Sequence, residues 1–231
     1  MKILALDTAT ALCGVAVLDA DGGVERVAVR RQRVTTHSEM LLPLVSECLS
    51  ELDLSAAELS AVACGAGPGS FTGLRIGLAT AKGLCFAIGL ELAMVSSLEA
   101  LAARAPQGRP VLAVLDAFRG QVFARLVAAA SARTALVEAA LLRTPALGGD
   151  AVYTPQALAE AVAGLDFSLI GRQGPWGGEL CDDNTAPHPL DVARLGAAQL
   201  RAGKRAVLSS AVPNYLCVSA AEEALGAGRA A

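Results

Sequence analysis

The chain has 231 residues, of which 54% are hydrophobic and 18% are charged, and its formal net charge is -3. This composition permits a large buried core and argues against extensive disorder. The small negative charge argues against autonomous binding to nucleic acid, because affinity for that backbone comes from several Lys or Arg contacts to phosphate. The length allows one domain or two small lobes.

The six cysteines stand at positions 13, 48, 64, 85, 181 and 217, without a Cys-x-x-Cys pair. This spacing argues against a zinc cage or a thioredoxin-type motif, and is typical of small buried side chains in a reducing compartment. Asp7 interrupts the apolar opening too early for a signal peptide, and no apolar run approaches the ~20 residues of a membrane span. We therefore expect a cytoplasmic protein that does not engage a membrane.

The first half of the chain predicts a meander of three strands followed by alternating helices and strands. The expected strands are Lys2–Asp7, Cys13–Leu18, Val24–Arg30, Ala61–Gly65 and Leu92–Val95. The expected helices are His37–Leu52, a short one opened by a capping box from Ser55 to Glu58, Phe71–Ile88, and one that begins near Ser97.

The second half predicts a shorter version of the same order. Its expected strands are Val111–Ala117, Gln121–Ala129, Ala135–Leu142 and Phe167–Gly171, and its helices follow Thr154-Pro155 and cover Leu190–Ala202. A βββαβαβα order is the plan of the actin, sugar-kinase and Hsp70 (ASKHA) superfamily. We therefore expect an α/β fold with lobes at 1–105 and 106–220, the second one reduced, and a frayed tail at 221–231.

The most specific stretch is the glycine-rich segment Gly65–Gly77, GAGPGSFTGLRIG. It follows a predicted strand and opens a helix, so its backbone N–H groups could receive an anion. Candidate nucleotide or anion contacts are Asp7, Thr8, Gly67, Gly69, Ser70, Thr72 and Arg75. Asp7 would address the magnesium ion of a nucleotide. The alternatives are a hairpin turn at Asp7 and a close-packing stripe formed by Gly73, Gly77 and Ala81.

The helix at His37 lacks a metal-binding pair. Two metal ligands on one helix face stand four residues apart. The residue four positions after His37 is Leu41, and the other histidine of the chain is the distant His188. We expect His37 to cap the helix or to form a hydrogen bond near its start, and we expect no metal site.

The same helix is apolar over about 200° of its circumference, whereas covering one core needs somewhat over 100°. The surplus predicts an interface with another subunit, formed by Leu41, Leu42, Val45 and Leu49 together with the Gly73, Gly77 and Ala81 stripe. The alternative is that the second lobe or the loops cover this surface.

Two further segments are candidate phosphate or adenosine contacts. Arg119, in Asp116-Ala117-Phe118-Arg119-Gly120, could bind a phosphate or pair with Asp116 in the turn. Gly171-Arg172-Gln173-Gly174 follows a strand, but Arg172 stands where close approach of a base would need glycine. We expect this second site to be degraded.

Four segments in order resemble the bacterial TsaB (YeaZ) family: Ile3–Thr10, His37–Pro43, Gly67–Gly77 and Pro213–Leu216. The resemblance implies a noncatalytic scaffold in the synthesis of N6-threonylcarbamoyladenosine at position 37 of ANN-reading tRNAs. It implies a TsaD-like catalytic partner, a TsaE-like ATPase, indirect contact with tRNA, and a homodimer when the chain is alone. It implies no intrinsic cofactor, with ATP or ADP at the partner interface. Cys217 and Phe118 depart from the family pattern.

An alternative from another class is a small-molecule kinase or ATPase of the actin-like superfamily, which would use Asp7 and the glycine loop around ATP. Peptidase activity has no intact set of residues behind it.

Overall fold

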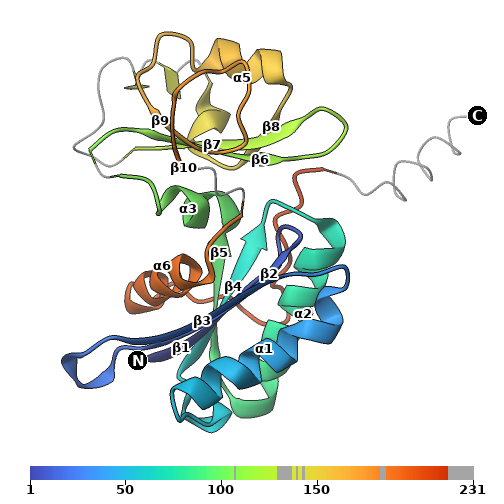
Figure 1. Cartoon of the computed structure of the whole chain (residues 1–231), viewed down its shortest axis with the longest axis vertical. Helices are drawn as coiled ribbons and strands as arrows, with labels where there is room; N and C mark the ends of the chain where they lie inside the picture. Colours follow the sequence, from blue (N-terminus) through green and yellow to red (C-terminus); the bar gives the residue numbers. More distant parts are fainter. Residues whose placement is uncertain (107, 129–136, 139, 142–143, 183–185, 218–231) are drawn as a thin grey trace, which may run out of the picture.

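A computed structural model describes residues 1–106, 108–128, 137–138, 140–141, 144–182 and 186–217. Two lobes, each built on a five-stranded sheet, lie one above the other along the long axis of the molecule (Figure 1). The predicted tail at 221–231 lies outside the described residues.

The first sheet has the strand order β3-β2-β1-β4-β5. Its strands are β1 (Lys2–Asp7), β2 (Leu12–Asp19), β3 (Arg26–Arg33), β4 (Ala61–Gly67) and β5 (Glu91–Ser96). The meander β1–β3 is antiparallel, and β4 and β5 run parallel to β1. Helices α1 (His37–Glu51) and α2 (Phe71–Ile88) cover one face, and α6 (Pro189–Arg201) covers the other (Figure 1). Burial on both faces explains the near-continuous apolar strands.

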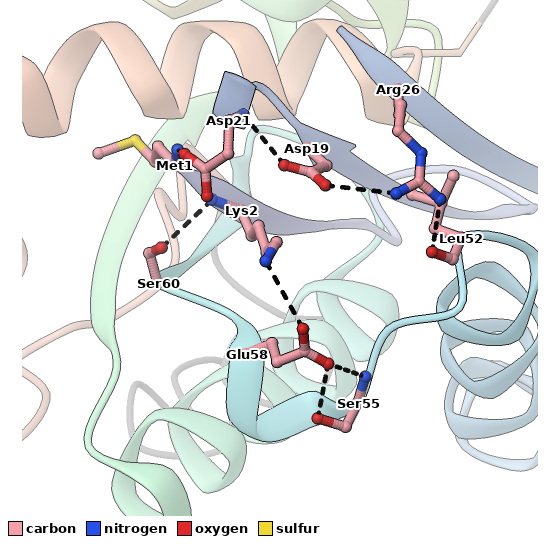
Figure 2. A network of polar contacts seen from close by, with 9 residues as sticks. All are labelled: Met1, Lys2, Asp19, Asp21, Arg26, Leu52, Ser55, Glu58 and Ser60. Carbon is pink, nitrogen blue, oxygen red and sulfur yellow. Dashed lines mark hydrogen bonds and ion pairs between the residues drawn. The ribbon is translucent and has the colours of Figure 1, made fainter. Parts of the chain in front are cut away.

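A network of polar contacts connects the start of β1, the turn between β2 and β3, and the segment that follows α1 (Figure 2). The Lys2 ammonium pairs with Glu58 at 3.6 Å, and Glu58 accepts the Ser55 N–H at 2.8 Å in the predicted capping box, which is confirmed. Arg26 on β3 donates to the carbonyl oxygen of Leu52, just after α1, at 2.6 Å. Exposed ion pairs add little stability, so these contacts chiefly fix where the connecting turns lie.

The second sheet has the order β10-β9-β6-β7-β8. Its strands are β6 (Val111–Asp116), β7 (Val122–Val127), β8 (Ala151–Tyr153), β9 (Ser168–Gly171) and β10 (Glu179–Asp182), with α5 (Pro155–Ala161) between β8 and β9. Taken from β8, the order β8-β7-β6-β9-β10 repeats β3-β2-β1-β4-β5. This repeat of one topology, with shorter elements in the second copy, confirms the actin-like fold.

The third strand of this lobe was predicted in the wrong place. The expected strand Ala135–Leu142 lies partly outside the described residues, and its described residues, 137–138 and 140–141, are helical. Val137, Glu138, Ala140 and Leu141 include strong helix formers, and that local preference prevails. The strand β8 takes the third position, while β10, four residues with a register shift, is too short to show a strand pattern.

Two helices pack across the boundary between the lobes. Helix α3 (Ser97–Ala102) follows β5, yet its Leu98 and Leu101 pack against β6, β7 and β9 of the second lobe. Helix α6 comes last, yet its Val192 and Ala197 pack against the first sheet. The predicted division at 105/106 falls between the two sheets; α3 contacts both lobes, while α6, which the prediction placed in the second lobe, packs on the first sheet.

Helix α2 lies unusually close to the end of β1. A Cβ added at Gly73 would lie 2.1 Å from the carbonyl oxygen of Thr8, and one added at Gly77 would lie 2.3 Å from the Thr8 hydroxyl oxygen. The Thr8 hydroxyl donates to the carbonyl oxygen of Gly73 at 2.7 Å. Gly73 and Gly77 therefore allow α2 to lie against the end of β1 in the chain's own first lobe.

By length and apolar composition, α2 could also cross a membrane. Helices in the core of a packed domain have the same composition, and α2 buries Leu74, Leu78 and Cys85 in the first lobe. Packing on the sheet accounts for these apolar positions.

The substitution Gly73→Ala should destabilise the fold, because its methyl group would meet a backbone oxygen that no side-chain rotation can move away. We expect the free energy of unfolding to fall by about 3 kcal/mol in urea denaturation. The matched control is Gly83→Ala, since Gly83 is exposed on the same helix with no atom within 4 Å of the added Cβ. That change should raise stability by about 0.5–1 kcal/mol. Equal effects at the two positions would contradict the close contact.

Candidate functional site

A cleft of about 870 Å³ lies between the lobes. The first lobe lines it with the β1–β2 turn, the end of β3 and the N-termini of α1 and α2, and the second lobe lines it with the ends of β6 and β9. Its polar lining residues are Thr10, Arg33, Thr35, Thr36, His37, Ser70, Thr72, Asp116, Arg172 and Gln173. The volume lies in the range of small-molecule sites, roughly 300–1,000 Å³.

Three of the predicted anion contacts, Gly69, Ser70 and Thr72, line this cleft. Ser70 caps α2, because its hydroxyl oxygen accepts the Gly73 N–H at 3.2 Å, and its own N–H donates to the carbonyl oxygen of Ala9 at 2.7 Å. A Cβ on Gly69 would lie 2.3 Å from that same carbonyl oxygen. The glycine loop is thus held against the β1–β2 turn, which supports the packing interpretation of this segment.

Asp7 does not line the cleft, and its side chain is buried, with 2% of its surface exposed. Its Oδ1 accepts the Ala9 N–H at 3.2 Å, whereas its Oδ2 has no hydrogen-bond partner and lies against Gly65. Burial raises the pKa of Asp7 to about 7, although the Ala9 N–H, the nearby Ser97 hydroxyl and the Arg31 charge act to lower it. The Asp7 carboxyl group is therefore buried and is not among the residues that line the cleft.

The remaining predicted anion contacts also point elsewhere. The Thr8 hydroxyl is bonded to α2, and Gly67 is buried with its Cβ position 3.2 Å from the carbonyl oxygen of Asn214. Arg75 is exposed, but its Nε donates to the Tyr215 hydroxyl at 3.0 Å and its guanidinium lies 3.9 Å from the centre of the Phe71 ring. None of these three residues lines the cleft.

On the second lobe, an ion pair lines one side of the cleft. Arg172, just after β9, pairs with Asp116 at the end of β6, and the Phe118 N–H donates to the same Asp116 carboxylate at 3.3 Å. Gly171 has a φ of +95°, and a Cβ there would lie 2.1 Å from the carbonyl oxygen of Val114. Gly171 thus approaches β6 closely, and the Arg172 guanidinium that follows it is held by Asp116 at the edge of the cleft.

Sequence reasoning missed part of the first-lobe wall, namely Thr10, Arg33, Thr35 and Thr36. The available signal was weak: these polar residues stand at strand ends and before α1. His37 behaves as predicted, since its Nε2 forms a hydrogen bond of 2.9 Å with the carbonyl oxygen of Thr10. This bond ties the start of α1 to the β1–β2 turn.

The other histidine, His188, caps a helix. His188 Nδ1 accepts the Leu190 N–H at 3.3 Å at the start of α6, a role that needs an unprotonated ring nitrogen. Burial lowers the pKa of His188 to about 4, and the charges of Arg104, Arg31 and Arg194 act in the same direction. Among the described residues, no group of three His, Cys, Asp or Glu side chains could hold a metal ion.

The cysteines fit the predicted role of small buried side chains. Cys13, Cys48, Cys64 and Cys85 are buried and unpaired, and Cys217 is half-buried. Burial raises the pKa of the Cys13, Cys48 and Cys85 thiols to about 11. These three therefore stay protonated and unreactive near neutral pH.

Comparison with known proteins places this geometry in a family. Residues 26–175 match the family model described as TsaD, tRNA N6-adenosine threonylcarbamoyltransferase. Over 128 residues the chain is 42% identical to the tRNA threonylcarbamoyladenosine biosynthesis protein TsaB of Escherichia coli (strain K12). A solved structure, YeaZ from Pseudomonas aeruginosa, superposes with a TM-score of 0.72 at 28% identity, over 93% of this chain and 99% of that one. The chain belongs to the TsaB/YeaZ family.

The sequence likeness to TsaB proteins is limited in extent. The chain is 36% identical over 126 residues to TsaB of Haemophilus influenzae (strain ATCC 51907 / DSM 11121 / KW20 / Rd). The alignments cover 53% of this chain in both comparisons, and 53% of the E. coli and 52% of the H. influenzae protein. The chain thus spans about half the length of the curated relatives it matches, while the likeness to the YeaZ structure extends over nearly the whole chain.

Most of the residues predicted to form the partner interface are not accessible in the structure. Six of its seven residues are buried within the first lobe: Leu41, Val45, Leu49, Gly73, Gly77 and Ala81. The broad apolar arc of α1 is covered by β2, β3 and α2 of the same chain, and the small residues of α2 face the first sheet. Of the predicted set, only Leu42 is accessible, with 55% of its surface exposed.

The outer face of the same two helices carries other accessible apolar positions. Phe86 near the end of α2 is 86% exposed, and Ala79 and Gly83 are exposed on the same side of that helix. Ala79, Gly83 and Phe86 on α2, taken together with the exposed Leu42 on α1, are called the outer α1/α2 face below.

The substitution Asp7→Asn should change how stability depends on pH. The raised pKa means that the folded chain holds a proton that the unfolded chain releases near pH 4, so stability is lost as pH rises toward about 7. From pH 5 to pH 8, the wild type should lose about 2–3 kcal/mol of unfolding free energy relative to the variant, at about 1.4 kcal/mol per pKa unit. Urea denaturation at both pH values measures this difference. Parallel profiles would show that Asp7 does not titrate in this range.

Proposed function

We propose that the chain is a noncatalytic subunit of the cytoplasmic complex that makes N6-threonylcarbamoyladenosine at position 37 of ANN-reading tRNAs. In this role it binds a TsaD-like catalytic subunit and supports its working shape. The names of the TsaB relatives support the pathway. The observation that carries the noncatalytic role is the position of Asp7, whose carboxyl group is buried against Gly65 instead of facing the cleft.

The charges around the cleft support the same role. Asp116 is the one carboxylate among the residues that line it, and Arg172 pairs with it. A general base must reach the proton that it removes and must be ready to accept it. Arg172 holds the Asp116 carboxylate and Asp7 is buried, while the His37 ring, which also lines the cleft, is bonded through Nε2 to the carbonyl oxygen of Thr10. These contacts support a noncatalytic role.

The outer α1/α2 face is the docking surface that the geometry favours. A phenylalanine side chain that is 86% exposed offers a large apolar area to a partner, and aromatic anchors carry much of the binding energy at interfaces. Because Ala79 and Gly83 have small side chains, a partner helix can approach the backbone of α2 closely beside Phe86. The same face would serve self-pairing when the catalytic subunit is absent. A TsaE-like ATPase and tRNA join through the complex.

Phe86→Asp should weaken the complex with the TsaD-like subunit by about 30-fold or more, because a charge would replace the apolar anchor. Leu42→Asp should act in the same direction. Co-purification and isothermal titration with the catalytic subunit measure the loss. The matched control is Val24→Asp, which changes a residue that is 70% exposed and lies outside α1 and α2.

The control should bind like the wild type, and all three variants should keep the wild-type circular dichroism spectrum. In cells that depend on this chain, Phe86→Asp should also lower the threonylcarbamoyladenosine content of tRNA. Full binding by folded Phe86→Asp would rule out this docking surface. If the threonylcarbamoyladenosine content of tRNA stayed normal after deletion of the chain, the proposed function itself would be ruled out.

The kinase or ATPase alternative rests on the volume of the cleft. Because Asp7 is buried and Arg172 is paired with Asp116 at the cleft, we expect the isolated chain to bind Mg-ATP no more tightly than about 1 mM. Titration calorimetry of the wild type and of Asp7→Asn should then give the same weak signal. Micromolar binding that Asp7→Asn abolishes would favour the alternative.

A further inference from the structure

Residues 206–217, which follow α6 at the end of the described chain, run from the first lobe to the second and are called the strap below. It begins at the edge of the first sheet, where the Ala206 N–H donates to the carbonyl oxygen of Leu92 on β5 at 2.8 Å. Further along, the Asn214 N–H donates to the carbonyl oxygen of Ala66 on β4 at 2.7 Å. Backbone hydrogen bonds therefore fix both ends of this stretch to the first lobe.

Side chains hold the strap against α2. The Tyr215 ring lies 4.8 Å from the Phe71 ring, centre to centre, and its hydroxyl accepts a hydrogen bond from Arg75. The Lys82 ammonium donates to the carbonyl oxygen of Ala211 at 3.2 Å. Arg75, which the sequence suggested as an anion contact, is thus part of the anchoring of the strap.

The strap then reaches the second lobe through Asn214. The Asn214 amide donates to Asp150 Oδ2 at 2.9 Å, and Asp150 Oδ1 accepts the Ser96 hydroxyl at 2.8 Å and an Arg125 N–H at 3.2 Å. Ser96 ends β5 in the first lobe, whereas Asp150 and Arg125 belong to the second. The Asp150 side chain is 8% exposed, so one buried carboxylate joins the strap and both lobes.

Apolar contacts continue the same connection. Leu216 and Cys217 pack against the cluster that α3 forms with the second sheet, which includes Leu98, Leu115 and Ile170. Within four residues, from Asn214 to Cys217, the strap contacts β4, α2, Asp150 and the second-lobe core.

We propose that the strap locks the two lobes at a fixed angle and thereby holds the width of the cleft. Lobes that flank a cleft commonly close by a hinge movement. Here such a movement would break the Asn214–Asp150 hydrogen bond and leave a buried carboxylate short of a donor, which is costly. It would also pull Leu216 from its cluster or Tyr215 from Phe71. The Pro213–Leu216 motif then has a mechanical role, which holds whether or not the proposed partner binds.

Distance measurement between spin labels tests the lock in the isolated full-length chain. Labels are placed at Ser50→Cys on α1 and Ala157→Cys on α5, two exposed positions. Cys181 is replaced by alanine, and Cys217, a strap residue, is replaced by valine so that its apolar contact with the second lobe is kept. The parent should give one narrow distribution. The double variant Asn214→Ala/Tyr215→Ala should shift or broaden it by roughly 3 Å or more, as expected for released lobes.

The matched control is Val212→Ala, since this strap residue is 69% exposed, and the control should keep the parent distribution. Asn214→Asp is a second, size-conserving variant that opposes two carboxylates at the same contact and should also release the lobes. It decides the question if the double variant fails to fold. Parent-like distributions in folded samples of the variants would overturn the lock. Because the partner is absent, this result is independent of the test at Phe86.

Discussion

The close contact between α2 and the end of β1 is the packing constraint on which the arrangement of the glycine loop and of the β1–β2 turn depends. Thr8 fills the space that side chains at Gly73 and Gly77 would need, and its hydroxyl is bonded to the helix. With the helix this close, the glycine loop lies on the β1–β2 turn, and Asp7 lies inside the core. The cleft is open between the lobes, but the Asp7 carboxyl group is buried and does not line it.

The sequence predicts the first lobe well because its signals are local. Strand periodicity, the capping box at Ser55 and the glycine loop each specify their own element, and the structure has all of them within a few residues. The second lobe is harder, since β8 has three residues and β10 has four. Such strands depend on their neighbours in the sheet, and a helix-forming segment near residue 140 resembled a strand more than β8 did.

The candidate site shows a different limit. Periodicity correctly identified α1 as apolar over a wide arc and α2 as rich in small residues, but it does not reveal which surface covers them. The chain's own sheet covers Leu41, Val45 and Gly77, and the accessible residue Phe86 received no weight. Likewise, Arg33 and Thr35 join the cleft only because the second lobe faces them across it. Long-range packing of this kind leaves little trace in local sequence.

The exchange of helices between the lobes constrains how this chain can be divided or shortened. A fragment ending at residue 105 would lack α6, so Ile3, Ala5 and Ala63 on one face of its sheet would meet water. The second half therefore supplies a structural cover for the first, whatever else it contributes. Its strands can become short, as β8 and β10 are, but the segment that delivers α6 cannot be lost.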